Sequence, residues 1–193
     1  WHKSESEKAT SWKTIRPTSM KSNLAKLEVM EDGSIYSSGD VTKRDVFDLN
    51  FTSDQPITAL RLEALTDDRL PGYGPGRCYY EGRKGTFFLS EVEVKTANGI
   101  KVPLSKPIAS GGNGAEKVID QDGSSGWSSA IGQANHLILP LTKPLPANQP
   151  LSMSLLFERH FVASLGRFRI SATSSEKQFK AAKIGVEAEH ILS

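Results

Sequence analysis

Apolar and polar residues alternate along much of the chain, and the alternating runs are separated by clusters of glycine, proline, aspartate and serine. Alternation with a period of two is typical of a β-strand with one buried face. In residues 57–65 the alternation changes phase, because Ile57 and Ala59 share one face whereas Leu60 and Leu62 fall on the other. Strands are predicted over residues 45–51, 57–65, 86–94, 135–141, 150–158 and 165–173.

These predicted strands, separated by frequent turn signals, indicate an all-β fold, either an antiparallel β-sandwich or a jelly roll. The C-terminal residues break the pattern because they contain good helix formers and few β-branched residues. We therefore expect an N-terminal linker over residues 1–12 and a β-sandwich domain over residues 13–174. A short helical or extended tail over residues 175–193 would lead to a following domain.

The segment over residues 66–85 is a long predicted loop. It contains two prolines and five glycines, so neither a helix nor a central strand fits it. Loops of this length in compact domains are usually functional or disordered. Aromatic rings can stack on sugars, and arginine N–H groups can donate to sugar hydroxyls. The candidate carbohydrate-binding residues are Tyr73, Arg77, Tyr79, Tyr80 and Arg83. Alternatively, Tyr79 and Tyr80 pack beneath the loop and hold it in place.

Composition and charge exclude several classes of protein. Lys and Arg number 24, Asp and Glu number 22, and the lysines are scattered, so the chain lacks the basic stripe of a nucleic-acid-binding protein. No apolar run approaches the ~20 residues of a membrane helix, so we expect no membrane insertion. Cys78 is the single cysteine, and the chain contains no C-x-x-C-H haem motif. We expect this cysteine to be a small buried core residue.

Motifs of catalysis are missing from the sequence. None of the four histidines lies in an H-E-x-x-H zinc motif, and the chain has no G-x-S-x-G elbow and no Walker loop. A β-domain without a nucleophile motif is more often a binding or structural module, so we expect no enzymatic activity. An enzyme that pairs two carboxylates from distant strands, as glycosidases do, is a third alternative.

The segment "KVIDQDGSSGW", residues 117–127, places several oxygen-bearing side chains close together. Ca²⁺ prefers oxygen ligands, and Asp120, Asp122 and Ser125 offer them around the turn-forming Gly123. The segment does not match the EF-hand loop. From composition alone, the favoured interpretation is a turn in which an aspartate accepts hydrogen bonds from its own backbone.

The longer segment "AEKVIDQDGSSGW" resembles the "A-x-x-x-x-D-G-x-x-x-T-x-W" calcium loop of discoidin-like, galactose-binding-like β-sandwiches, and "LSEVEV" resembles their "L-x-E-I-x-V" strand. In this sequence Gln121 stands where the family has glycine, and the "LSEVEV" strand precedes the loop instead of following it. The resemblance implies a structural Ca²⁺ with these ligands: the side chains of Asp120 and Glu91, the carbonyls of Lys117 and Asp122, and the hydroxyl of Ser125.

A second resemblance covers about residues 12–193. The segments "ITALRLEALTDDRLPGYGPGR", "GTFFLSEVEV" and "LGRFRISAT" together are similar to a region of planctomycete-type secreted cytochrome c proteins, where it lies between domains of unknown function. The resemblance implies a secreted or periplasmic location, a role with complex polysaccharides, and haem carried on a separate segment.

These observations predict a galactose-binding-like β-sandwich that serves as a non-catalytic carbohydrate-binding module of a larger extracytoplasmic protein. A polysaccharide or oligosaccharide would bind loops at one end of the sandwich, above all residues 72–85, and Ca²⁺ would hold the fold closed without touching the sugar. The alternative is a structural spacer that packs between the flanking domains of the same polypeptide and binds no glycan.

Overall fold

A computed structural model describes residues 10–128, 132–176 and 179. Residues 1–9 of the predicted linker and most of the predicted tail lie outside the described residues. Two short 3₁₀ helices are present, η1 (Pro71–Tyr73) and η2 (Ala115–Ile119), and the described part of the chain contains no α-helix. The strands are β1 (Lys13–Thr14), β2 (Ser19–Ser22), β3 (Ala25–Val29), β4 (Ile35–Gly39), β5 (Asp45–Phe51), β6 (Ile57–Ala64), β7 (Phe88–Leu89), β8 (Glu91–Thr96), β9 (Ile108–Ala109), β10 (Trp127–Ser128), β11 (Asn135–Leu145), β12 (Leu151–Phe157) and β13 (Arg167–Thr173).

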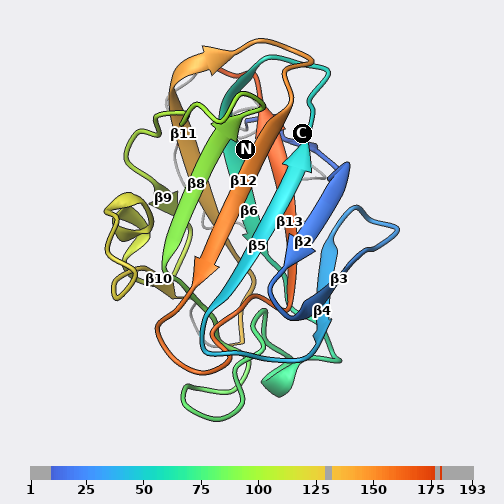
Figure 1. Cartoon of the computed structure of the whole chain (residues 1–193), viewed down its shortest axis with the longest axis vertical. Helices are drawn as coiled ribbons and strands as arrows, with labels where there is room; N and C mark the ends of the chain where they lie inside the picture. Colours follow the sequence, from blue (N-terminus) through green and yellow to red (C-terminus); the bar gives the residue numbers. More distant parts are fainter. Residues whose placement is uncertain (1–9, 129–131, 177–178, 180–193) are drawn as a thin grey trace, which may run out of the picture.

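Two antiparallel sheets pack face to face (Figure 1), which confirms the predicted antiparallel β-sandwich. The larger sheet has the strand order β3-β4-β13-β6-β11-β9, and β1 pairs with β13 beside this path. The smaller sheet has the order β2-β5-β12-β8, and β7 pairs with β10 in a separate short ribbon. Among the described residues, no helix has the length and apolar character needed to span a membrane.

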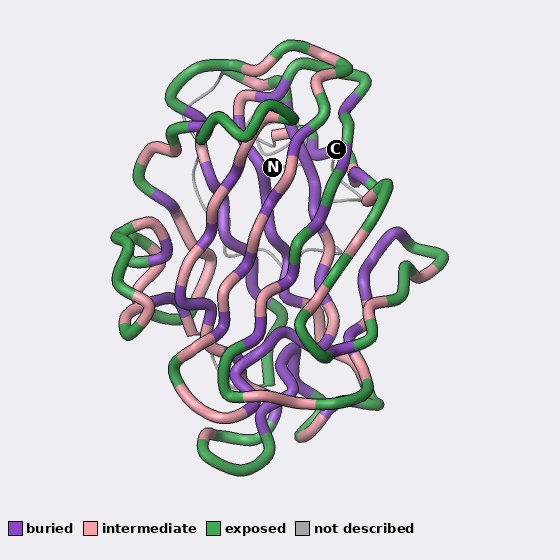
Figure 2. The backbone as a smooth tube through the Cα atoms, viewed as in Figure 1, coloured by how far each residue is buried: buried purple, intermediate pink, exposed green. Residues whose placement is uncertain are grey.

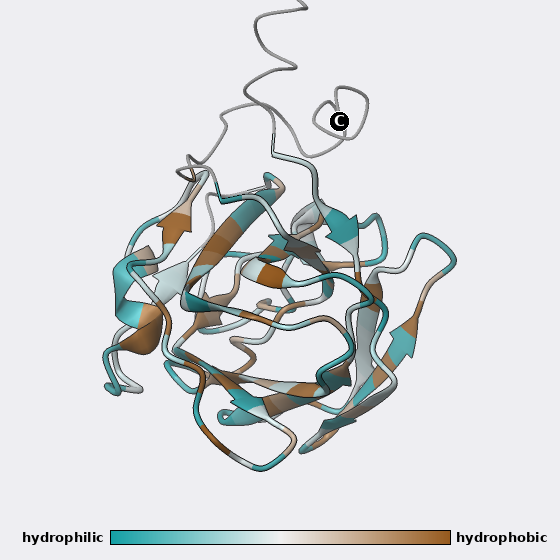
Figure 3. Ribbon diagram, turned by 90° about the horizontal axis from the view of Figure 1, so that it is seen from above, coloured by the Kyte–Doolittle hydropathy of each residue, from teal (hydrophilic) through white to brown (hydrophobic). Residues whose placement is uncertain are grey.

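The two sheets lie one above the other when the molecule is seen from above (Figure 3), and apolar residues from both sheets form one core. In β5, Phe47 and Leu49 are fully buried while Asp48 between them is exposed, so burial alternates along the strand (Figure 2). The Phe47 ring lies 5.0 Å from Phe157 of β12 and 5.8 Å from Phe168 of β13, measured between centroids. Because Phe168 belongs to the opposite sheet, these rings join the layers, and each contributes roughly 1.5–3 kcal/mol through burial.

The change of phase in residues 57–65 corresponds to a bulge in the larger sheet. The pairing of β11 with β6 shifts register between Pro140, which lies opposite Ala59, and Leu145, which lies opposite Ile57. Ile57 joins the main core together with Leu60 and Leu62, whereas Ala59 packs on the outer face of the sheet, so the prediction that Ile57 and Ala59 share one face is wrong. The extra residues lie in β11, between Pro140 and Leu145, and they interrupt its pairing beside the start of β6.

The outer face of the larger sheet carries a group of polar side chains that are buried or, for Arg169, partly buried. This group is here called the outer-face cluster: Arg61, Glu63, His136, Arg169 and Ser171. Arg169 donates to both oxygens of Glu63, at 2.8 and 3.2 Å, and the Ser171 hydroxyl donates to Glu63 at 3.0 Å. Burial raises the pKa of Glu63, but the hydrogen bond from Arg169 and the charges of both arginines outweigh it and lower that pKa. Glu63 is therefore held as a buried carboxylate.

Trp12 covers part of the outer-face cluster. Its ring lies 4.7 Å from the guanidinium carbon of Arg61, a cation–π contact, and its side chain packs with Ala59 and Ile138. Trp12 is buried, so this residue of the predicted linker packs on the sandwich. The larger sheet is consequently covered on both faces around β6.

Candidate functional site

Residues 66–85 leave the end of β6 and form a well-anchored loop at one end of the sandwich, at the bottom of Figure 1. The Arg77 N–H donates to the Ser164 carbonyl at 3.0 Å, and the Gly85 N–H donates to the Cys78 carbonyl at 2.8 Å. At Gly76 a Cβ atom would lie 1.9 Å from the Thr86 carbonyl oxygen, so only glycine allows this close backbone approach. The prolines and glycines of the loop thus build a compact turn structure.

The three tyrosines predicted to bind carbohydrate are exposed: Tyr73 by 69%, Tyr79 by 50% and Tyr80 by 75%. The alternative interpretation, in which Tyr79 and Tyr80 pack beneath the loop, is therefore wrong. Arg83 is also exposed. Cys78, which belongs to the same loop, is fully buried, as expected for a small core residue.

Arg77 occupies a different position from the tyrosines, because it is only 7% exposed. Its guanidinium donates to the carbonyls of Gly39 and Asp40, the latter at 3.2 Å, and lies 3.4 Å from the Ser37 hydroxyl. Burial lowers the pKa of Arg77, and the nearby Asp45 acts against this effect. The hydrogen bonds of Arg77 hold the end of β4 against the loop, which is a structural task.

A cavity of about 700 Å³, here called the first cavity, lies between this loop and β4. Leu24, which is 53% exposed, and Tyr79 offer apolar surface at this cavity. Ser38 and Asp40 add polar groups to the same lining. The Asp40 side chain is exposed and has no ion-pair partner among the described residues. The first cavity therefore combines aromatic and aliphatic surface with hydrogen-bonding groups.

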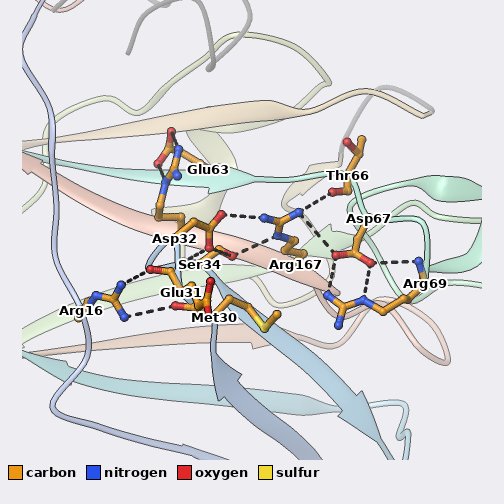
Figure 4. Close-up of polar contacts among 11 residues, drawn as sticks. Arg16, Met30, Glu31, Asp32, Ser34, Glu63, Thr66, Asp67, Arg69 and Arg167 are labelled. Carbon is orange, nitrogen blue, oxygen red and sulfur yellow. Dashed lines mark hydrogen bonds and ion pairs between the residues drawn. The ribbon is translucent and has the colours of Figure 1, made fainter. Parts of the chain in front are cut away.

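Arg69 sits beside the first cavity in a chain of alternating charges (Figure 4). Its Nε and Nη2 donate to the two carboxylate oxygens of Asp67, at 2.7 and 2.8 Å, and its guanidinium carbon lies 3.9 Å from the centroid of the Tyr36 ring. Asp67 also lies 3.6 Å from Nη1 of Arg167, whose Nη2 donates to Asp32 at 2.7 Å. Two-pronged, charge-assisted contacts of this kind fix an arginine in one orientation.

The carboxylates of this charge chain are stabilised in their ionised form. The hydrogen bond from Arg69 lowers the pKa of Asp67. Burial raises the pKa of Asp32, but hydrogen bonds from Ser34 and Arg167 outweigh it and lower that pKa to about 2. Sequence reasoning missed these residues because the partners come from a turn, a loop and a strand that are far apart in the chain. The only local signal is the short spacing of Asp67 and Arg69.

A second cavity, of about 450 Å³, shares Arg69 with the first cavity. Its lining includes the exposed Tyr73 together with Asp67, Asp68 and Arg167. Arg69 lines both cavities, whereas Tyr80 lines neither. Of the predicted tyrosines, Tyr73 and Tyr79 thus have a concave surface beside them.

The predicted calcium loop follows η2 and lies against the start of β8, which brings Asp120 and Glu91 together. Burial raises the pKa of Glu91 to about 7, and the Asp120 carboxyl beside it acts in the same direction, against the N–H groups of Gln121 and Asp122. Oε1 of Glu91 is buried without a hydrogen-bond partner. Two carboxyl groups in contact, one with an unpartnered oxygen, suit a bound cation.

The remaining predicted ligands also lie in this loop, and each makes a hydrogen bond in the turn. The Ser125 hydroxyl donates to Asp120 at 2.6 Å, and the Asp122 N–H donates to the same carboxylate at 2.9 Å. The Lys117 carbonyl accepts the Asp120 N–H, and the Asp122 carbonyl accepts the Ser125 N–H. The hydrogen bond from Ser125 lowers the pKa of Asp120.

These contacts form the aspartate turn that was predicted from the composition of the segment. The contact between the carboxyl groups of Glu91 and Asp120 is an additional feature. Gln121 has φ of 66°, the left-handed conformation that glycine adopts most easily. Within the described part of the chain, no three His, Cys, Asp or Glu side chains form a group that could hold a metal. A cation here would therefore need carbonyl and hydroxyl ligands besides Glu91 and Asp120.

Trp127, which ends the calcium-loop segment, is fully buried. Its Nε1 donates to the Gly111 carbonyl at 2.9 Å, and its ring meets Phe87 edge to face with centroids 4.9 Å apart. Trp127 therefore anchors the end of the segment in the core and offers no surface to a sugar.

Comparison with solved structures finds a likeness to the catalytic domain of a GH87 α-1,3-glucanase in complex with nigerose, at 12% sequence identity and a TM-score of 0.37. The likeness covers 90% of this chain and 30% of that chain, so this chain spans less than a third of its length. A variant of that domain in complex with tetrasaccharides gives 14% identity, a TM-score of 0.38 and the same coverage.

The fiber head domain of snake adenovirus 1 gives 14% identity and a TM-score of 0.24, over 72% of this chain and 99% of that chain. At such TM-scores neither likeness carries an argument about function. No family model matches the chain, and no curated protein matches it by sequence.

Proposed function

We propose that this chain is a non-catalytic carbohydrate-binding module of a larger extracytoplasmic protein and that a polysaccharide binds at the loop end of the sandwich. The observation that carries the proposal is the first cavity, where exposed Tyr79 and Leu24 stand beside Ser38 and Asp40. The apolar face of a sugar ring can stack on Tyr79 while its hydroxyls hydrogen-bond to Ser38 and Asp40. The anchored loop keeps these groups in place before the sugar arrives.

We propose further that Glu91 and Asp120 hold a structural Ca²⁺ together with the Lys117 and Asp122 carbonyls and the Ser125 hydroxyl. The buried, unpartnered oxygen of Glu91 and its contact with a second carboxyl support this proposal. When bound, the ion would neutralise both carboxylates. Glu91 lies at the start of β8 and Asp120 at the end of η2, so these side chains would tie the strand to the loop.

Affinity gel electrophoresis tests the carbohydrate proposal. The gels contain laminarin, starch, xylan, galactomannan, polygalacturonate or carrageenan, and we expect at least one of them to retard the folded protein. Tyr79→Ala should weaken binding roughly tenfold through loss of stacking. Tyr80→Ala is the matched control, because this neighbouring tyrosine is also exposed to solvent but lines neither cavity. If no polysaccharide retards a protein that circular dichroism shows to be folded, the spacer alternative replaces this proposal.

Thermal unfolding with and without Ca²⁺ tests the metal proposal. An ion that binds only the native state at a hundred times its Kd should stabilise it by about 2.7 kcal/mol. Asp120→Ala should abolish the response, whereas the matched control Asp122→Asn should keep it because Asp122 is expected to contribute its backbone carbonyl. An unfolding midpoint that is the same in Ca²⁺ and in chelator would overturn the proposal.

A further inference from the structure

Arg69 lines both cavities at the loop end of the sandwich, and each cavity has one exposed tyrosine in its lining. We propose that the two cavities are successive subsites of one groove and that the groove takes an extended, electrically neutral polysaccharide chain. This inference rests on the proposed carbohydrate binding and adds to it the class of polysaccharide and the extent of the site.

The arrangement of aromatic side chains supports a groove with two subsites. Tyr79 lines the first cavity and Tyr73 lines the second, and both belong to residues 66–85. Volumes of about 700 and 450 Å³ both fall in the range of small-ligand sites. A single sugar ring needs only one stacking platform. Two platforms, one in each of two cavities that share Arg69, suit a chain that continues from one cavity to the next.

The fixed orientation of Arg69 supports its place at the boundary. Asp67 holds one edge of the guanidinium with two hydrogen bonds, and the Tyr36 ring lies against its face. The Nη1 group is the edge of the guanidinium that Asp67 leaves unused, and it can donate to a hydroxyl of a chain crossing between the cavities. Because Arg69 is already ordered, this contact costs little side-chain entropy on binding.

The charges around the groove favour a neutral ligand. Its cationic side chains are Arg69, Arg77 and Arg167, and each is already engaged within the protein. Arg69 is bound to Asp67, Arg167 is bound to Asp32, and Arg77 is bound to backbone carbonyls. Because Asp67 and Asp32 already balance the charges of Arg69 and Arg167, a carboxylate or sulfate of an acidic polysaccharide would find little uncompensated positive charge there.

Two further carboxylates make the groove unfavourable for an anion. Asp40 lines the first cavity and Asp68 lines the second, and both are exposed. Neither forms an ion pair among the described residues, although the charge of Asp40 acts on the buried Arg77. Sugar hydroxyls can donate to these oxygens, whereas a negatively charged sugar would be repelled by them.

Titration calorimetry with a ladder of oligosaccharides from the retained polysaccharide tests the two-subsite groove. Affinity should rise with chain length until both cavities are filled. Tyr79→Ala should weaken all members of the ladder that bind. Tyr73→Ala should weaken the long members roughly tenfold and leave the shortest binding member unchanged. Tyr80→Ala should match the wild type at every length. If Tyr73→Ala weakened the affinity equally for oligosaccharides of every length, or for none of them, the proposal of a two-subsite groove would be overturned.

The preference for a neutral ligand is tested by affinity gel electrophoresis. Retention by the neutral polymers laminarin, starch, xylan and galactomannan is compared with retention by the acidic polymers polygalacturonate and carrageenan. We expect retention by neutral polymers alone, with an affinity that is nearly independent of NaCl concentration because no ion pair forms. Retention by the acidic polymers alone would overturn this inference and leave the carbohydrate-binding proposal in place. Retention by none would overturn both.

Discussion

The pH dependence of stability should reveal the buried state of His136. This histidine lies opposite Glu63 in the pairing of β11 with β6 and is 2% exposed. Burial lowers its pKa to about 4, the charge of Arg61 acts in the same direction, and Glu63 acts against both. In the unfolded chain the same imidazole has its ordinary pKa of about 6.5. Between these two values the unfolded state binds a proton that the folded state does not bind.

The magnitude follows from the difference between the two pKa values. Because the unfolded state binds more protons, the free energy of unfolding falls as the pH is lowered from 7 towards 4. At about 1.36 kcal/mol per pKa unit, the loss due to His136 is about 2 kcal/mol at pH 5 and about 3 kcal/mol at pH 4. Above pH 7 this contribution to stability is fully present.

Urea denaturation of the wild type and of His136→Gln, followed by tryptophan fluorescence, measures the effect. The free energy of unfolding of the wild type minus that of the variant should fall by about 3 kcal/mol between pH 7 and pH 4. Titrations that both proteins share cancel in this difference. His136→Asn provides a second variant with a smaller side chain and should give the same pH dependence. A difference that stays constant over this range would refute the reasoning, because it would mean that His136 titrates alike in both states.

Three other predictions concern the packing of the chain. Glu63→Gln should lower the free energy of unfolding by about 3–5 kcal/mol in urea denaturation, since the buried Arg61 and the partly buried Arg169 lose their counter-charge. The control Glu93→Gln, on the partly exposed face of β8, should lower it by less than about 1 kcal/mol. Gly76→Ala should lower the unfolding free energy by roughly 1–3 kcal/mol because its Cβ would meet the Thr86 carbonyl, and a stability equal to wild type would contradict the backbone geometry. The thiol of Cys78 should react with Ellman's reagent only after denaturation, and rapid labelling of the native protein would contradict its burial.

The sequence predicts much of the sandwich because its strands follow simple alternation. The bounds predicted for residues 45–51 match β5. The faces predicted for residues 57–65 are correct for Ala59, Leu60 and Leu62 but wrong for Ile57, which lies beside the bulge of β11 and faces the main core. Residues 86–94 were predicted as one strand, but the structure divides them at Ser90 into β7 and β8. The break arises because β7 pairs with β10 whereas β8 pairs with β12. The sequence does not reveal it, since strong strand-forming residues stand on both sides of Ser90.

The candidate site was only partly predictable. Exposed tyrosines in a loop rich in proline and glycine could be identified from local sequence alone. The role of Arg77 could not, because its partners Gly39 and Asp40 come from a strand end that only the folded chain brings close. The same holds for Glu63, which alternation assigns to a polar face, although Trp12 and neighbouring strands bury that face.

The pairing of β1 with β13 has a mechanical consequence. Lys13 lies opposite Ala172 and Thr14 opposite Ser171, so the first and the last strand of the described chain pair in one antiparallel ladder. Tension applied between the start of β1 and the end of β13 would therefore break the ladder one residue pair after another, and it would not load all pairs at once. The two pairs of β1 would part at low force, while β13 would stay bound to β6 along six further pairs. The sandwich could then release a short length of chain under load and keep its core and its binding loops intact.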